Sequence, residues 1–230
     1  MDPIVEREKR YWEDKKDFEW LTADSIESVV SLLPPVGKEC DVLELCGGSG
    51  MFTKRMPKTF RSYTALDLSS TLLKALKAAV PEAAVVQGDA QRPDFGERSF
   101  DLVVIFAGLH HMPDIRTTVA NAFRILKRGG AFVCFEPNDA CWYRRFMLPL
   151  KGLLGLYTED EKFLRPDSVA EDLREAGFTD LRTRFLSPTY NPEHLGSALN
   201  KGLARAMALA SRVGDGPAWQ PWFILSGRKP

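Results

Sequence analysis

Residues 41–50 have the sequence DVLELCGGSG, an apolar run that leads directly into a turn almost free of side chains. The run at 42–45 is typical of a short buried strand, with Glu44 near its end. Glycines in the turn let backbone N–H groups approach a bound ligand, and residues 51–56 are expected to open a helix after it. Short glycine motifs also occur in turns that bind nothing, so the flanking sequence decides which interpretation holds.

The flanking sequence alternates strands with helices. Runs typical of strands follow at 63–66, 84–86, 100–106, 131–135, 180–186 and 222–226. Apolar side chains at helical spacing are found at 23–33, 70–80, 115–126, 167–177 and 194–213. Such alternation is typical of βαβ units, and near-continuous apolar runs are typical of central strands buried on both faces. The sequence therefore predicts an α/β fold with a doubly wound, mostly parallel sheet and helices on both faces.

Carboxylates stand at or just after the ends of three predicted strands, at Glu44, Asp67 and Asp89. Because right-handed crossovers bring the carboxyl ends of parallel strands to one edge of the sheet, these side chains are expected to meet in one crevice. Any one of them alone could be a solvated charge or a helix cap. All three at this spacing favour a ligand site at the switch point of the sheet.

Composition limits the kinds of partner that we expect. The chain has 230 residues, a mass of 25.8 kDa and 31 basic against 31 acidic side chains, which suits one domain and favours neither nucleic acid nor an anionic membrane. Its beginning lacks the apolar core of a signal peptide, and no apolar run approaches membrane-spanning length. The four cysteines match no metal-binding or redox spacing and are expected to be reduced thiols of a cytoplasmic protein that binds no metal: Cys40, Cys46, Cys134 and Cys141.

An ordered set of motifs covers about the first 137 residues. It comprises an acidic residue and glycine turn at 44–50, Asp67, the tripeptide GDA at 88–90, FDLVVIFAGLHHMPD at 100–114 and LKRGGAFVCFEP at 126–137. In this order the set resembles class I S-adenosylmethionine-dependent methyltransferases, in particular their small-molecule branch. Cys46 stands where the first glycine of the family usually lies, and we expect a slightly altered turn rather than a lost site.

The resemblance implies a Rossmann-like, seven-stranded sheet whose last strand is antiparallel, with S-adenosylmethionine as cofactor and S-adenosylhomocysteine as product. It implies that Asp67 accepts hydrogen bonds from the ribose hydroxyls, a task suited to a carboxylate. It further implies that Asp89 accepts from the adenine amino group, that Ala90 N–H faces a ring nitrogen and that Leu68 packs on the adenine. The cofactor-binding residues that it implies are Glu44, Cys46, Gly47, Gly48, Gly50, Asp67, Leu68, Gly88, Asp89, Ala90, Phe106 and Ala107.

A dinucleotide is the main rival cofactor. Its fingerprint requires a final glycine or alanine for close helix–strand packing, and Thr53 occupies that position when the motif begins at Gly48. The turn also lacks a basic residue that would neutralise a pyrophosphate, a group that a sulfonium cofactor does not have. An NAD(P)-dependent oxidoreductase is therefore disfavoured. A non-catalytic protein that binds S-adenosylmethionine is the other alternative.

His110 and His111 follow the fourth predicted strand, near the expected methyl group. Either could act as a general base for an acceptor that loses a proton, because histidine titrates near neutral pH. The alternative is that both support the loop structurally. Residues 107–109 lack the motif of nucleobase amino methylases, and the chain has no Pro-Cys dipeptide of the kind that cytosine-carbon methylases use. We therefore expect a small organic acceptor, methylated at oxygen rather than nitrogen.

The rest of the chain is expected to supply a helical lid around the acceptor. We assign residues 1–36 to an N-terminal helical flap, 37–137 to a cofactor-binding half and 138–230 to a substrate-side half with lid insertions, all within one domain. Large apolar side chains favour an apolar or aromatic acceptor, with candidate contacts at Tyr11, Trp20, Trp142, Tyr143 and Phe146. The same side chains could instead form core, pack on a second copy or touch a membrane, and a homodimer is allowed but not indicated.

Overall fold

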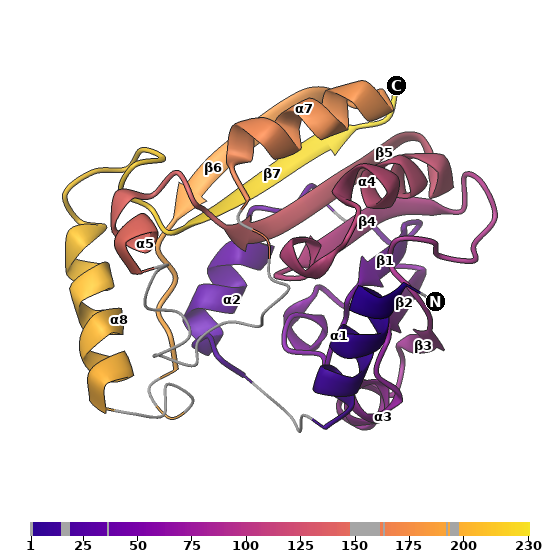
Figure 1. Cartoon of the computed structure of the whole chain (residues 1–230). Helices are drawn as coiled ribbons and strands as arrows, with labels where there is room; N and C mark the ends of the chain where they lie inside the picture. The colour runs from indigo at the N-terminus through magenta and orange to yellow at the C-terminus, as the bar shows by residue number, and fades with distance from the viewer. Residues whose placement is uncertain are drawn as a thin grey trace.

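The fold is built on one sheet. The structure is a computed structural model that describes residues 2–14, 19–35, 37–147, 162, 164–191, 193 and 198–230. Seven strands form the sheet in the order β3-β2-β1-β4-β5-β7-β6 (Figure 1). They are β1 Asp41–Leu45, β2 Ser62–Asp67, β3 Ala84–Gln87, β4 Phe100–Phe106, β5 Leu126–Pro137, β6 Thr179–Leu186 and β7 Trp222–Arg228. β1 to β5 pair in parallel, and β7 is antiparallel to both β5 and β6. The predicted doubly wound sheet with an antiparallel last strand is confirmed.

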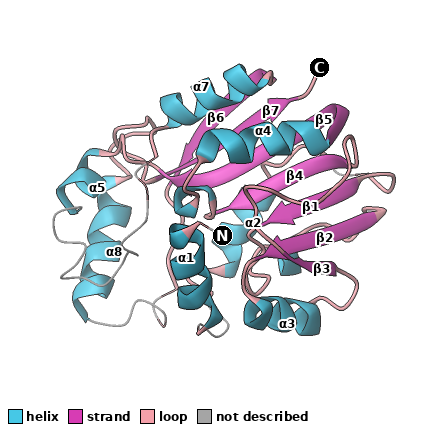
Figure 2. Cartoon of the chain, turned by 45° about the vertical axis from the view of Figure 1, so that its right-hand side comes forward, coloured by secondary structure: helices cyan, strands magenta, loops and turns pink. Residues whose placement is uncertain are grey.

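Helices cover both faces of this sheet. They are α1 Pro3–Glu13, α2 Ala23–Val30, α3 Ser70–Ala79, α4 Ile115–Ile125, α5 Trp142–Met147, α7 Pro166–Ala176 and α8 Ala198–Ala210, with the 3-10 turns η1 Thr53–Arg55 and η2 Leu109–His111. α4 and α7 pack on one face and α2 and α3 on the other, while α5 and α8 lie to one side of the sheet (Figures 1 and 2). Within the described residues, no helix combines the length and the apolar character that a membrane span requires.

The central strands contribute to two apolar layers, one on each face of the sheet. In β4, Val103 and Ile105 belong to the layer beneath α4 and α7, whereas Val104 and Phe106 belong to the opposite layer. These four residues are at most 5% exposed, so the strand is buried on both faces, as its continuous apolar sequence predicts. This packing fixes the carboxyl ends of β1 and β4 side by side, and the strand order reverses its direction between these two strands, which makes this edge the switch point of the sheet.

The segment after the glycine turn is not the predicted α-helix. Residues 51–56 form only η1, because Pro57 disfavours a helical conformation for the residue before it and Met56 is extended. Met51 and Phe52 are instead buried in the apolar layer beneath the turn.

The helix predicted near residue 167 is present with a different start. α7 begins at Pro166, since proline suits the first turn of a helix, and Asp167 lies within that turn rather than capping it. Gly177 ends the helix as predicted, with φ of +101° that favours glycine. A side chain at this position would also meet the Phe123 ring at 3.0 Å.

Cys46 adopts a backbone conformation that usually selects glycine. Its φ is +61°, in the left-handed region that costs other residues roughly 1–2 kcal/mol. Gly108, just beyond the neighbouring strand β4, makes room for the cysteine side chain. A Cβ on Gly108 would lie 2.6 Å from Cβ and 2.9 Å from Sγ of Cys46. The two residues are therefore mutually dependent, and the turn keeps its shape at a cost in strain.

We predict that Gly108→Ala lowers the free energy of unfolding by about 1–3 kcal/mol, because the added methyl group overlaps the Cys46 side chain. In a Cys46→Gly background the same substitution should cost much less, since both overlapping atoms are gone. Urea unfolding of the two single variants and the double variant measures this coupling. Equal costs of Gly108→Ala in the two backgrounds would show that these side chains do not compete for the space.

Candidate active site

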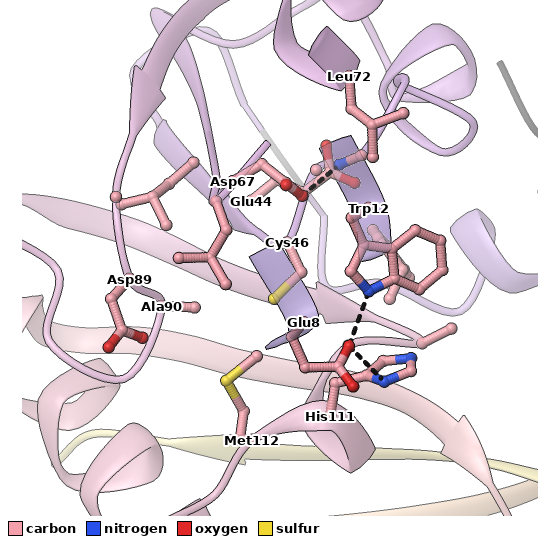
Figure 3. A pocket seen from close by; sticks show the side chains of 18 of the residues that line it. Glu8, Trp12, Glu44, Cys46, Asp67, Leu72, Asp89, Ala90, His111 and Met112 are labelled. Atoms are coloured by element: carbon pink, nitrogen blue, oxygen red, sulfur yellow. Dashed lines mark hydrogen bonds and ion pairs between the residues drawn. The ribbon is translucent and has the colours of Figure 1, made fainter. Parts of the chain in front are cut away.

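A pocket of about 1020 Å³, its open mouth included, lies at the carboxyl ends of β1, β2, β3 and β4. α1 crosses this end of the sheet and contributes a wall (Figure 2). The glycine turn after β1, the ends of β2 and β3, and the η2 loop converge on the same space (Figure 3). Of the residues implied to bind the cofactor, all but Gly50 line it, and Gly50 packs against Leu76 of α3.

Asp67 joins the glycine turn to the start of α3. Its Oδ2 accepts the Gly48 N–H at 2.9 Å, and its Oδ1 accepts the Ser69 N–H at 2.9 Å. Burial raises the pKa of Asp67, and these backbone hydrogen bonds oppose the shift. Because a carboxylate oxygen accepts more than one hydrogen bond, both oxygens can also accept from the paired hydroxyls of a ribose.

Asp89 and Ala90 form the next part of the wall. Asp89 Oδ1 accepts the Gln91 N–H at 2.9 Å, which holds the loop after β3 in shape. Ala90 is 3% exposed, and its N–H donates to no acceptor within the described part of the chain. A buried N–H without a partner is uncommon and costly. This donor beside a carboxylate fits the edge of an adenine ring, which offers a ring nitrogen and an amino group.

Glu44 is buried at the base of the pocket. Its Oε2 accepts hydrogen bonds from the Thr53 hydroxyl at 2.5 Å and the Tyr63 hydroxyl at 2.6 Å. Burial raises the pKa of Glu44 to about 7, although both hydroxyls lower it. A carboxylate held at the boundary of ionisation gains stability from any cation that enters the pocket.

The charge of the pocket discriminates between the rival cofactors. Its lining carries four carboxylates, Glu8, Glu44, Asp67 and Asp89, and among the described lining residues there is no lysine or arginine. Such a surface repels a pyrophosphate and attracts a sulfonium and an ammonium group. Among the described residues, the pocket included, no three His, Cys, Asp or Glu side chains come close enough together to hold a metal ion.

The two neighbouring histidines occupy different environments. His110 does not line the pocket, and its Nδ1 donates to Oε2 of Glu136 at 2.6 Å. Oε1 of the same carboxylate accepts the N–H groups of Gly108 and Leu109, at 3.1 and 2.8 Å. Burial lowers the pKa of His110 and so disfavours the charged form of the ring. Glu136, which sequence analysis did not single out, thereby fastens the η2 loop.

His111 does line the pocket, where it faces the N-terminal helix. Its Nδ1 lies 3.3 Å from Oε2 of Glu8, and the same oxygen accepts the Trp12 Nε1–H at 2.9 Å (Figure 3). The Trp12 and His111 rings meet edge to face at 5.4 Å. Sequence analysis missed Glu8 within a charged run, although its spacing of four residues from Trp12 places both on one face of a helix.

The predicted acceptor contacts are only partly brought together. Trp20 lines the pocket, whereas Tyr11 is 43% exposed and packs against Trp12 instead. Trp142 is 44% exposed and contacts Trp219. The side chains of Tyr143 and Phe146, and most of the predicted lid between 148 and 163, lie outside the described residues. Apolar lining residues that the prediction omitted are Met51, Phe52, Leu66, Leu72 and Met112.

Comparisons with known proteins agree on the class. A family profile for a methyltransferase domain matches residues 43–134. A demethylmenaquinone methyltransferase of Staphylococcus aureus is 28% identical over 70% of this chain and 77% of its own. A possible histamine N-methyltransferase of Thermotoga maritima superposes with a TM-score of 0.67 at 17% identity, covering 90% of this chain and 88% of that one. A geranyl diphosphate C-methyltransferase of Streptomyces coelicolor, crystallised with S-adenosylhomocysteine, gives 0.72 at 11% identity, covering 99% and 98%.

The methyltransferase profile, the curated relative and the fold together support a class I S-adenosylmethionine-dependent methyltransferase. S-adenosylmethionine is its cofactor, and the acidic pocket with its free Ala90 donor suits that molecule. The solved structures, at under 20% identity, support the fold, while the acceptor is a separate question.

We predict that S-adenosylmethionine binds and NADH does not, because the pocket lining is acidic. Asp67→Ala should weaken S-adenosylmethionine binding by roughly 1–3 kcal/mol, as expected for a lost hydrogen bond to a charged group. Calorimetric titration of both proteins with both cofactors measures this. Binding that is indifferent to Asp67, or a preference for NADH, would contradict the assignment of the pocket.

A second prediction concerns pH. Since burial raises the pKa of Glu44 to about 7, its carboxylate is mostly neutral at pH 6 and mostly charged at pH 8. The ratio of wild-type to Glu44→Gln affinity for S-adenosylmethionine should therefore grow up to about tenfold over this interval. Without cofactor, the Glu44→Gln variant should also unfold at a higher temperature than wild type at pH 8, where the buried charge of Glu44 destabilises the wild-type protein. A ratio that is flat with pH would mean that Glu44 does not face the cation.

Proposed function

We propose that this enzyme methylates a hydroxyl oxygen of a small aromatic acceptor. The observation that carries this proposal is the pairing of a flat apolar wall with one histidine in the same pocket. Trp20, Phe52 and Phe106 line the space, and the rings of Phe52 and Phe106 stack at 4.1 Å. Trp20 stacks on Trp222 at 4.9 Å, which limits its movement. Rigid aromatic surfaces of this kind favour a planar, apolar partner.

S-adenosylmethionine supplies an electrophilic methyl group on a sulfonium. The protein must hold the acceptor oxygen in line with that methyl group and exclude water, tasks suited to α1 and the aromatic wall. His111 is the proposed general base, because among the described lining residues it supplies a side-chain nitrogen that can accept a proton. It accepts the hydroxyl proton as the oxygen–carbon bond forms, and the cofactor leaves as a neutral thioether.

A ring carbon is the second candidate for the methylated atom. Loss of a proton from an aromatic hydroxyl places negative charge on the oxygen and on conjugated ring carbons alike. The likeness to a demethylmenaquinone methyltransferase and to a geranyl diphosphate C-methyltransferase favours this alternative. Nitrogen is less suited to the pocket. A neutral amine would make no use of a base at His111, and the carboxylates of the lining favour the protonated amine, which has no free electron pair to attack the methyl group.

The domain boundaries belong to the same proposal. We assign residues 1–36 to a flap over the pocket, 37–137 to the cofactor-binding half and 138–230 to the acceptor side, within a single catalytic unit. Support comes from α1, which contributes Glu8 and Trp12 to the pocket, and from the motifs confined to the middle segment.

The proposal predicts that His111→Ala lowers kcat for hydroxylated aromatic acceptors by about 10²–10⁴-fold while the Kd for S-adenosylmethionine is retained. An acceptor panel of phenols, quinols, amines and small polar alcohols should be screened with product identification by mass spectrometry and NMR. Methylation confined to amines or highly polar compounds would overturn the proposal. Tight cofactor binding without transfer to any acceptor would favour a non-catalytic binding protein.

A further inference from the structure

α1 is fastened across the pocket near its C-terminal end and at its middle. Near its C-terminus, Glu13 accepts the Ser70 hydroxyl at 2.6 Å and the Trp12 carbonyl accepts the Ser69 hydroxyl at 3.3 Å. These contacts tie the helix to the start of α3. Its middle approaches the η2 loop on the other side of the pocket through Glu8 (Figures 2 and 3). The helix therefore spans from the β2 side of the site to the β4 side.

Glu8 is unusual on this helix. It is 5% exposed, while the neighbouring Glu6 and Arg7 are exposed to solvent. Burial of a carboxylate is costly unless hydrogen-bond donors or a cation stabilise it. Trp12 supplies one donor through its indole N–H. His111 supplies a second group, with its Nδ1 3.3 Å from the same oxygen.

The His111 ring is incompletely satisfied in this arrangement. Its Nδ1 is buried, and at 3.3 Å its alignment with Glu8 does not make a hydrogen bond. Contacts of catalytic groups are often long or poorly aligned before the substrates bind, and they tighten in the complex. A small shift of α1 toward the loop would convert this approach into an Nδ1–H···Oε2 hydrogen bond.

We propose that Glu8 is the positioning residue for the His111 base. By accepting the Nδ1–H, it would leave Nε2 as the basic nitrogen that receives the acceptor's hydroxyl proton. The carboxylate then stabilises the imidazolium until its proton passes to solvent as product leaves. This inference rests on the proposed role of His111. It adds that the N-terminal helix completes the base only when it lies closed over the pocket.

Other charged groups near His111 are committed elsewhere. The His110 ring is 4.1 Å away between centroids, and its Nδ1 is held by Glu136. Glu136 also accepts two backbone N–H groups of the η2 loop, so its carboxylate serves the loop. Arg144 lies beyond and pairs with Asp139 at 3.3 Å. Glu8 is the carboxylate that reaches His111 from the pocket side.

The test compares Glu8→Gln with two matched variants of the same helix. Glu6→Gln removes an equal charge from the solvent side, and Glu13→Gln loosens the attachment of α1 to α3 without touching His111. For Glu8→Gln we expect kcat to fall about 10–100-fold. The acidic limb of the pH profile should move to lower pH, because the imidazolium loses the carboxylate that stabilises it. Glu6→Gln should leave kcat and the profile unchanged. Glu13→Gln should alter KM without moving the profile.

The outcomes separate the inference from the proposed function. If His111→Ala leaves kcat unchanged, the proposed base fails, and the role of Glu8 fails with it. If His111→Ala abolishes turnover but Glu8→Gln behaves like wild type, only the positioning role is overturned. If Glu8→Gln lowers kcat by the same factor as Glu13→Gln and leaves the pH profile unmoved, Glu8 only holds the helix in place. Thermal unfolding of each variant confirms that the comparison is made on folded protein.

Discussion

The hydrogen bonds accepted by the Asp67 carboxylate are the constraint on which the pocket depends. One oxygen holds the Gly48 N–H of the glycine turn, and the other holds the Ser69 N–H at the start of α3. A single side chain at the end of β2 thereby fixes two backbone segments that line the pocket. Because both oxygens keep accepting capacity, the same carboxylate can serve structure and ligand together. Removal of this charge would release the turn as well as a ligand contact.

Several features that lower the stability of the fold lie around this carboxylate. Glu44 is buried with a raised pKa, Ala90 has an unused N–H, and Cys46 and Ala107 both adopt positive φ. Each costs free energy in the absence of ligand, and all of them face one pocket. A cationic cofactor with a hydrogen-bonding base offsets the electrostatic part of these costs. Clustering of unfavourable features at one place is the physical signature that distinguishes a binding site from a structural turn.

The N-terminal helix α1 brings together two side chains of the pocket, Glu8 and His111, that come from distant segments of the chain. Glu8 and His111 are more than one hundred residues apart in sequence and meet only because α1 lies across the strand ends. The arrangement covers one side of the pocket and brings a carboxylate to His111, the histidine that lines it among the described residues. Enclosure and general-base chemistry would then depend on the same helix, so that transfer is restricted to the closed, water-excluding state.

By itself, the sequence determined the sheet and the strand-end carboxylates through local periodicity. The run at 100–106 became a doubly buried strand for that reason. The ordered motifs of the sequence indicated the cofactor class through their resemblance to a known family. Tertiary structure alone decided which of two adjacent histidines faces the pocket, since that choice depends on Glu136 and Glu8 from remote elements. It also decided how Cys46 is tolerated, because the space for its side chain is provided by Gly108 beyond a neighbouring strand. Contacts between distant segments leave no periodic trace in the chain, so only the folded arrangement reveals them.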